Sequence, residues 1–193
     1  MKKNIKIAVS GRSGCGNTTV SKMVADTLNL RFINFTFRSL AQERGLDLKT
    51  VLELAAEDDS WDREVDTRQV QIARGNDASC AANNSNANGC IKNEQGCVLG
   101  SRLAIWLLEE ADIKIYLDAS PEIRARRIVG REGGNAEEIT AFTHERDRQD
   151  HGRYLRIYNI DTDNHGFADL TINTDHLTPE QITDIIVEKV KNI

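Results

Sequence analysis

Short apolar runs alternate with longer amphipathic stretches along this chain. The apolar runs are typical of buried strands and lie at residues 6–10, 31–34, 98–99, 112–117 and 169–173. The amphipathic stretches repeat their apolar positions at helical spacing and lie at 18–28, 36–44, 47–58, 62–74, 101–110, 121–131, 136–158 and 179–191. Strands that alternate with helices predict an α/β fold, with a parallel sheet covered on both faces.

A polar stretch interrupts this pattern between Gly75 and Gly96. Ile91 is the only Leu, Ile or Val in it, whereas Asn occurs at six of its positions. Such a segment buries too little apolar surface to offset the entropy lost on ordering. We therefore interpret residues 77–95 as a flexible, Asn-rich surface insertion.

Length and charge narrow the possible classes of function. A chain of 193 residues suits one domain, 1–193, with a substantial core. A net charge of −5 argues against broad nucleic-acid binding, which usually needs a basic face. The longest apolar run, 103–108, is too short to span a membrane, and the first residues lack the pattern of a signal peptide. We expect a cytoplasmic monomer without nucleic-acid or membrane partners.

A glycine-rich segment joins the first expected strand to the first expected helix. Residues 10–19 nearly match the phosphate-binding pattern G-x-x-x-x-G-K-[ST], with Gly11, Gly16 and Thr18 in place. Glycines let successive backbone N–H groups turn towards a phosphate, and the helix directs its positive end at the same anion. The Thr18 hydroxyl can ligate Mg²⁺ held by the phosphates. We predict a phosphate-binding loop; the alternative is a tight turn that merely needs glycine.

Two residues inside this segment raise separate questions. Asn17 stands where the pattern has Lys, so one positive charge is missing, and a neutral donor is roughly half as strong as a charged one. Either another cation supplies that charge, or the loop binds without catalysing.

Cys15 lies near a helix N-terminus, where a thiol can have a lowered pKa. It is either a reactive group whose alkylation blocks nucleotide binding or a small inert filler.

Arginines are concentrated in residues 121–156, which hold eight of the sixteen in the chain and no Lys. Several of them, with one Asp, repeat at helical spacing on one face of each of two expected helices. These residues are Arg124, Arg127 and Arg131 in the first helix, and Arg146, Asp150 and Arg153 in the second. Two such helices closing over a nucleotide would supply the positioning and charge neutralisation that phosphoryl transfer needs. The alternative is intrahelical ion pairing on solvated faces.

Other polar residues lie near expected strand ends, where ligands bind in parallel sheets. Arg38 and Arg102 each follow such a strand and are candidates for holding the phosphate of an acceptor. Asp62, Asp66 and Gln69 share one helical face and are candidates for lining the same cleft. An ordinary surface position is the alternative for each of them.

The ordered combination of these motifs resembles the compact, archaeal-type cytidylate kinases, a branch of the P-loop nucleoside monophosphate kinases. The resemblance covers nearly the whole chain except the Asn-rich insertion. The residues that carry it are 11–19, 61–70, 101–106, 116–128, 145–154 and 160–161. Compact members of the family also lack Lys at the position of Asn17.

The resemblance implies a three-layer P-loop NTPase fold with a five-stranded parallel sheet, a helical acceptor-binding region at 36–75 and a mobile lid at 121–158. It implies ATP-dependent phosphorylation of CMP or dCMP to CDP or dCDP in pyrimidine nucleotide metabolism, with Mg²⁺ accompanying ATP. The implied ATP-binding residues are Gly11, Arg12, Ser13, Gly14, Cys15, Gly16, Asn17, Thr18 and Thr19, with Thr18 as the Mg²⁺ ligand. The implied acceptor-binding residues are Arg38, Arg102, Arg146 and Asp150. The implied catalytic residues are Arg124, Arg127, Arg131 and Arg153, around the transferring phosphate.

Two features depart from the family pattern. Gly100 stands where an acidic residue often lies, which removes a carboxylate that would support Mg²⁺. Residues 33–35 replace a small Ser/Gly turn before Arg38, which affects the base pocket. Two alternatives therefore stay open. One is a kinase for another nucleoside monophosphate, UMP or AMP, and the other is a non-catalytic ATP-binding regulator.

Overall fold

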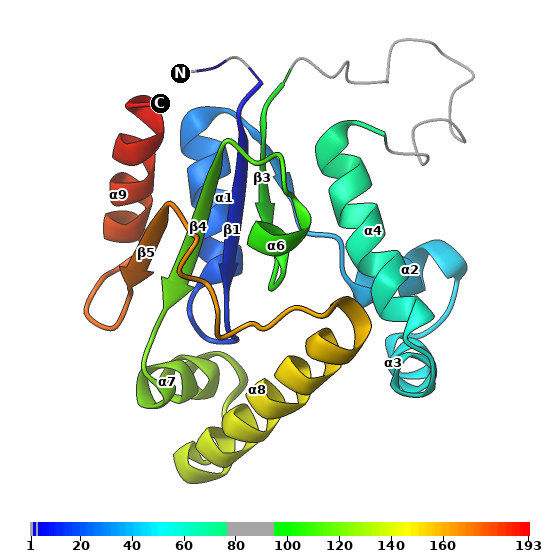
Figure 1. The fold of residues 1–193 in the computed structure, drawn as a ribbon. Coiled ribbons are helices and arrows are strands. Elements are labelled where there is room, and N and C mark those ends of the chain that lie inside the picture. The colour runs from blue at the N-terminus through cyan, green and yellow to red at the C-terminus, as the bar shows by residue number, and fades with distance from the viewer. Residues whose placement is uncertain (1, 3, 77–94) are drawn as a thin grey trace.

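The computed structural model describes residues 2, 4–76 and 95–193, and its centre is a parallel sheet (Figure 1). The strands are β1 (Lys6–Gly11), β2 (Arg31–Ile33), β3 (Cys97–Gly100), β4 (Ile113–Asp118) and β5 (Leu170–Asn173). They lie in the order β2-β3-β1-β4-β5, and every pair of neighbours is parallel. The predicted five-stranded parallel sheet is confirmed. The predicted insertion, except for Gln95, lies outside the described residues.

Successive strand residues enter opposite faces of the sheet and build two apolar cores. In β1, Ile7 and Val9 pack into one core, and Ala8 between them packs into the other. Helices α1 (Asn17–Leu28) and α9 (Pro179–Lys191) cover the first core. Helices α4 (Ser60–Arg74) and α6 (Ala104–Leu107) cover the second. The fold therefore has the three layers expected of its class.

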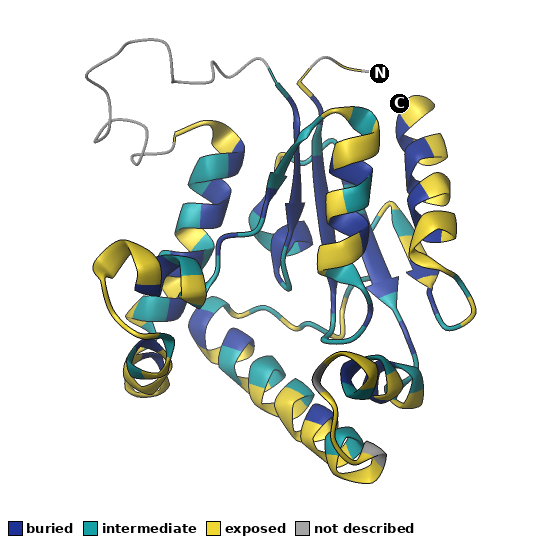
Figure 2. Cartoon of the chain, turned by 180° about the vertical axis from the view of Figure 1, so that it is seen from behind, coloured by how far each residue is buried: buried dark blue, intermediate teal, exposed yellow. Residues whose placement is uncertain are grey.

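The remaining helices lie at the carboxyl ends of the strands (Figure 1). They are α2 (Phe37–Arg44), α3 (Leu48–Glu57), α7 (Pro121–Glu132) and α8 (Ala136–Tyr158). Side chains fix several helix starts, because Thr36 and Thr178 each form a capping box and Asn135 accepts from two backbone N–H groups of α8. Figure 2 shows that α8 exposes much of its surface, whereas the central strands β1, β3 and β4 are almost wholly buried.

The helix predicted at 101–110 is shorter in the structure, where α6 has only four residues. The backbone N–H of Ser101 donates to the carbonyl of Val9 at 3.2 Å, so pairing with β1 continues past the end of β3. The side chain of Ser10 then accepts from the N–H of Ile105 at 3.1 Å. These tertiary hydrogen bonds hold the start of the segment in turns. No helix in the described ranges has the length and apolar character needed to cross a membrane.

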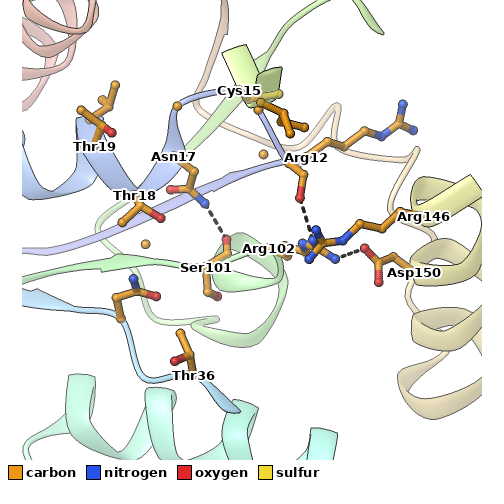
Figure 3. Close-up of a pocket in the computed structure, with 18 of the residues that line it drawn as sticks. Arg12, Cys15, Asn17, Thr18, Thr19, Thr36, Ser101, Arg102, Arg146 and Asp150 are labelled. Atoms are coloured by element: carbon orange, nitrogen blue, oxygen red, sulfur yellow. Dashed lines mark hydrogen bonds and ion pairs between the residues drawn. The ribbon is translucent and has the colours of Figure 1, made fainter. Parts of the chain in front are cut away.

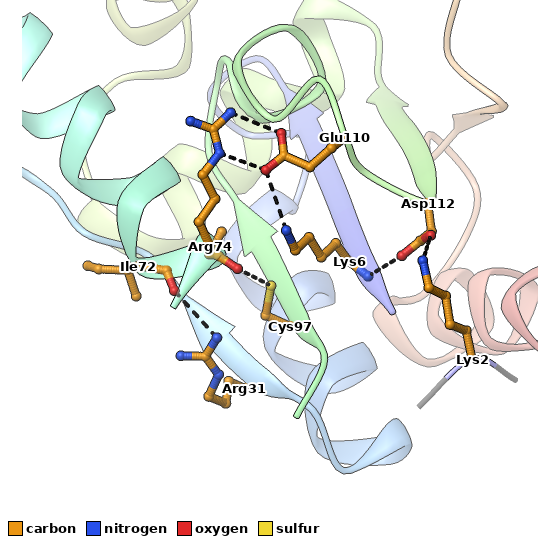
Figure 4. A network of polar contacts seen from close by, with 9 residues as sticks. Lys2, Lys6, Arg31, Ile72, Arg74, Cys97, Glu110 and Asp112 are labelled. Carbon is orange, nitrogen blue, oxygen red and sulfur yellow. Dashed lines mark hydrogen bonds and ion pairs between the residues drawn. The ribbon is translucent and has the colours of Figure 1, made fainter. Parts of the chain in front are cut away.

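A charged network ties α4 to the amino ends of the strands (Figure 4). Glu110 accepts hydrogen bonds from Arg74 at 2.7 and 3.0 Å, and Lys6 contacts the same carboxylate at 3.4 Å. The bonds from Arg74 lower the pKa of Glu110 to about 2. Asp112 accepts from the backbone N–H of Lys6 and from Lys2, both at 2.8 Å. Ion pairs and hydrogen bonds therefore cover the amino ends of these strands, and the glycine-rich segment lies at the opposite, carboxyl end of the sheet.

Candidate active site

A pocket of about 1100 Å³ opens at the carboxyl ends of the strands. Its walls come from the glycine-rich segment, the end of β3, α4, α7 and α8, which are far apart in sequence. All of residues 11–19 line it. A ligand site at this edge is the position expected for an open parallel α/β sheet.

The glycine-rich segment forms an open turn around the start of α1 (Figure 3). Gly14 and Gly16 have φ angles of 86° and 91°, in the left-handed region that favours glycine. A Cβ on Gly14 would lie 2.8 Å from the Cβ of Arg124, so the residue is confined from behind as well. No side chain of the described residues caps α1 at Gly16. The positive end of this helix therefore faces the pocket and suits an anion.

Asn17 holds the loop to the end of β3 (Figure 3). Its Nδ2 donates to the carbonyl of Ser101 at 3.1 Å, and its Oδ1 accepts from the hydroxyl of Ser21 at 2.9 Å. A Cβ on Gly100 would lie 2.6 Å from that hydroxyl oxygen. Glycine at 100 and Asn at 17 therefore fit together, and a carboxylate at 100 would displace Ser21. The Asn17 amide is engaged by protein groups, so positive charge for a phosphate has to come from elsewhere in the pocket.

The hypothesis of a reactive thiol at Cys15 is wrong. Its side chain is buried in the core between the sheet and α1. Burial raises the pKa of the thiol from its ordinary value of 9.0 to about 11, although Arg124 and Arg127 oppose this shift. The effect of desolvation on the thiol pKa is larger than the opposing effect of the helix N-terminus. Cys15 is therefore the small, inert core residue of the second interpretation.

We expect Cys15 to resist alkylation in the native protein. At a pH of about 8, a pKa of about 11 leaves roughly one thiol in a thousand ionised, and the thiolate is the reactive form. The measurement is iodoacetamide labelling followed by mass spectrometry of the peptide that contains Cys15. The same reaction in denaturant should label it fully. Rapid labelling of the native protein would contradict the buried position.

Five of the seven predicted catalytic and acceptor-binding arginines line the pocket, together with Asp150. These five are Arg102, Arg127, Arg131, Arg146 and Arg153. The structure does not bring Arg38 there, since it lies exposed on α2 and is not among the lining residues. It does not bring Arg124 there either. The pocket wall thus carries several guanidinium groups opposite the start of α1.

Arg124 lies behind the loop instead of in the pocket. Its side chain is 1% exposed and donates to the Asp147 carboxylate at 3.2 and 2.5 Å. It also donates to the carbonyl of Ser13 at 3.2 Å. A buried charge requires such partners, and here they belong to the loop and to α8. Arg124 therefore joins these two elements and does not face a phosphate.

Asp150 connects two guanidinium groups at the pocket wall. It forms an ion pair with Arg102, and its Oδ1 accepts from Arg153 at 2.8 Å. Arg102 also donates to the Ser13 hydroxyl at 2.7 Å, and Arg153 lies 3.5 Å from the buried carboxylate of Asp62. The chain of contacts runs from the loop to α4. It fixes both guanidinium groups before any ligand arrives.

Arg127 is held at the other side of the loop. It donates to the carbonyl of Gly14 at 3.3 Å and to the hydroxyl and carbonyl of Thr174 at 2.9 and 2.5 Å. Nearby, Leu177, Pro179 and Ile182 form an apolar part of the lining that the sequence analysis missed. Their signal was available, because they follow the last strand and so lie at the same sheet edge as the loop.

The polar face of α4 lines the pocket as predicted. Asp62 and Gln69 are buried, and the hydroxyl of Tyr158 donates to the Asp66 carboxylate at 2.7 Å. Burial raises the pKa of Asp66 to about 6, against the opposing effect of that hydrogen bond. A buried carboxylate and amide at a pocket wall can bind polar edges of a ligand.

Comparisons with known proteins agree with this geometry. Residues 6–176 match the model of the cytidylate kinase-like family. A relative named cytidylate kinase 2, from Borreliella afzelii, is 39% identical over 96% of this chain and 96% of its own length. A cytidylate kinase from Pyrococcus horikoshii is 34% identical over 100% of this chain and 91% of its own length. A shikimate kinase structure from Acinetobacter baumannii, in complex with shikimate, shares the fold with a TM-score of 0.60 at 16% identity, covering 99% of this chain and 95% of that one. The match over most of the chain, with relatives of nearly equal length, shows that this protein belongs to the cytidylate kinase-like family.

Proposed function

We propose that this protein transfers the γ-phosphoryl group of ATP to CMP or dCMP and releases CDP or dCDP. The observation that carries the proposal is one pocket with two anion-binding walls, the loop with the start of α1 on one side and the guanidinium groups on the other. Two phosphorylated substrates need two such walls. The family relatives supply the identity of the acceptor, since they are named as cytidylate kinases. We place the reaction in pyrimidine nucleotide metabolism of the cytoplasm, carried out by a monomer.

In this proposal residues 11–19 bind the phosphates of ATP, and the nucleotide brings Mg²⁺. The Thr18 hydroxyl fits this ion, because Thr18 is exposed in the pocket at the start of α1. Mg²⁺ needs few protein ligands when phosphates and water complete its shell, so Gly100 is compatible with it. When bound, the ion neutralises charge on the phosphates. Arg127 and Arg131 supply further positive charge from α7.

The acceptor lies against α8 and the end of β3. Arg102 and Arg146 bind its phosphate, Asp150 keeps Arg102 in place, and Arg153 faces the transferring group. The acceptor phosphate is already anionic, so the reaction needs no general base and depends on alignment and charge neutralisation. Arg124 has an indirect role, because it holds the phosphate-binding loop in place through its hydrogen bond to the Ser13 carbonyl. Arg38 contributes only if α2, in the proposed acceptor-binding region 36–75, moves towards the proposed lid at 121–158.

A coupled assay of ADP release with a panel of monophosphates tests the proposal. We expect turnover with CMP and dCMP, and far slower turnover with UMP and AMP. Turnover with UMP or AMP alone would show that the acceptor is that monophosphate and not CMP or dCMP. If ATP binds but no ADP is released with any monophosphate of the panel, the protein is a non-catalytic ATP-binding regulator and not a kinase.

A further inference from the structure

We propose that Gln69, oriented by Asp66 and Tyr158, reads the amino-bearing edge of the cytosine base and thereby distinguishes CMP from UMP. This inference rests on the proposed function, because it assigns a base-reading group to the acceptor side of the same pocket. Gln69 is the group that contacts the base, and the other two are positioning residues.

The first step is a buried acceptor that lacks a partner. Gln69 is 5% exposed and lines the pocket, and its Oε1 has no hydrogen-bond partner among the described residues. The Oδ2 of Asp62, about two helical turns earlier on the same face of α4, is also buried and has no hydrogen-bond partner among the described residues. A buried acceptor without a partner is costly, so such atoms at a pocket wall indicate a ligand that donates.

The second step is the fixed direction of the Gln69 amide. Its Nε2 donates to Oδ1 of Asp66 at 3.3 Å, and the Tyr158 hydroxyl donates to Oδ2 of the same carboxylate. An ionised carboxylate only accepts, so it holds the NH₂ end of the amide towards itself. Reversing the amide would set two oxygens against each other. The carbonyl end of Gln69 is therefore the end available to a ligand.

The third step is the match to the base. Cytosine carries an amino group, which donates, where uracil carries a carbonyl oxygen, which accepts. The amino group of cytosine can donate to Oε1 of Gln69, whereas the uracil oxygen would face another acceptor. The apolar side chains of Phe35 and Val65, which belong to one apolar cluster, also line the pocket and suit the faces of a flat ring. Adenine also carries an amino group, so polarity selects against uracil and the size of the pocket has to select against adenine.

Titration calorimetry with CMP and with UMP tests the inference without requiring turnover. In the wild-type protein we expect CMP to bind at least about tenfold more tightly than UMP, the factor that roughly one hydrogen bond supplies. Asp66→Asn gives the amide at 66 a donor that can face Oε1, so it should remove most of the preference, raising the CMP-to-UMP ratio of dissociation constants about tenfold or more. Gln69→Leu should weaken CMP binding and leave UMP binding nearly unchanged. Gln71→Leu on the same helix is the control, because Gln71 does not line the pocket, and it should keep the ratio.

The wild-type protein offers a second measurement that needs no substitution. Asp66 faces Tyr158 and Arg153 from α8 and Asp62 from its own helix, and its pKa is about 6. When the pH falls from about 8 to about 6, Asp66 gains a proton and can donate to Oε1, so the reversed amide is no longer opposed. The preference for CMP should therefore decrease at low pH. The phosphate groups of CMP and UMP titrate alike, so their effect cancels in the ratio.

The outcomes separate this inference from the proposed function. A CMP-to-UMP ratio that Asp66→Asn and low pH leave unchanged overturns the role of the Gln69 group, even if CMP is phosphorylated. Tight, discriminating binding of CMP without ADP release keeps the base-reading role and overturns the proposed function. Binding of neither monophosphate overturns both.

Discussion

Gly14→Ala is expected to abolish ATP binding and to destabilise the fold, whereas Gly130→Ala should stabilise it. Gly14 has a φ of 86°, and a Cβ there would lie 2.8 to 2.9 Å from three atoms of Arg124. The unfavourable backbone angle and the overlap together should cost about 2–5 kcal/mol of folding free energy. Relief requires the loop to move away from α7, which would misplace the N–H groups that face the phosphates. We expect the Kd for ATP to rise more than about 100-fold.

Gly130 provides a matched control for the same chemical change. It lies inside α7, its φ is not positive, and a Cβ would meet no atom of its surroundings within 4 Å. Alanine there should raise the free energy of unfolding by about 0.5–1 kcal/mol through its higher helix propensity. Urea unfolding and ATP titration of the two variants make the comparison. Equal stability and equal ATP affinity of both variants would show that the loop is not confined as described.

Arg102→Met should lower kcat/KM for CMP by about 100- to 1000-fold, which is typical of losing one well-placed charged donor near a transferring group. Arg102 joins the Ser13 hydroxyl in the loop to Asp150 on α8. Methionine keeps most of the apolar stem and removes only the guanidinium. Asp150 retains its bond to Arg153, so we expect unfolding to change little and the loss to appear in turnover and in CMP affinity.

Arg148→Met is the control for this substitution. Arg148 lies on α8, is 75% exposed and contacts Glu145 one turn away. An exposed ion pair of this kind contributes less than about 1 kcal/mol, so kinetics and stability should stay near those of the wild-type protein. Steady-state kinetics with CMP and ATP compare the two variants. Kinetics of Arg102→Met within about twofold of wild type would remove Arg102 from the acceptor site.

The spacing of apolar residues predicted helix bounds well where tertiary contacts do not alter the hydrogen bonding of the segment. The helix expected at 136–158 has these bounds in the structure, because Asn135 caps its start and Asn159, with a left-handed φ of 55°, ends it. The helix expected at 101–110 was too long, because Ser10 and Val9 of β1 bind the backbone of that segment. Hydrogen bonds from another strand are not encoded in the periodicity of the segment itself.

Many of the residues that line the pocket could be predicted from the sequence, but their individual roles could not. Spacing correctly placed Arg124 and Arg127 on the same side of one helix, yet only Arg127 lines the pocket. The difference comes from Asp147, which lies 23 residues after Arg124 in sequence and takes its guanidinium into the interior. The same limit applies to Cys15, since its reactivity depends on a core assembled from other strands and helices. Burial is a property of the folded chain, and composition does not reveal it.

Contacts on both sides of Asp150 and Arg153 hold this part of α8 to the rest of the fold. Arg124 holds the helix at Asp147, and farther along Arg63 donates to the carbonyl of Ile157 at 2.8 Å. Asp150 and Arg153 lie between these two contacts. Their positions are therefore set by the scaffold before substrate arrives, and less conformational entropy is lost when an anion meets them. Much of the ordering that binding would otherwise require has already taken place during folding.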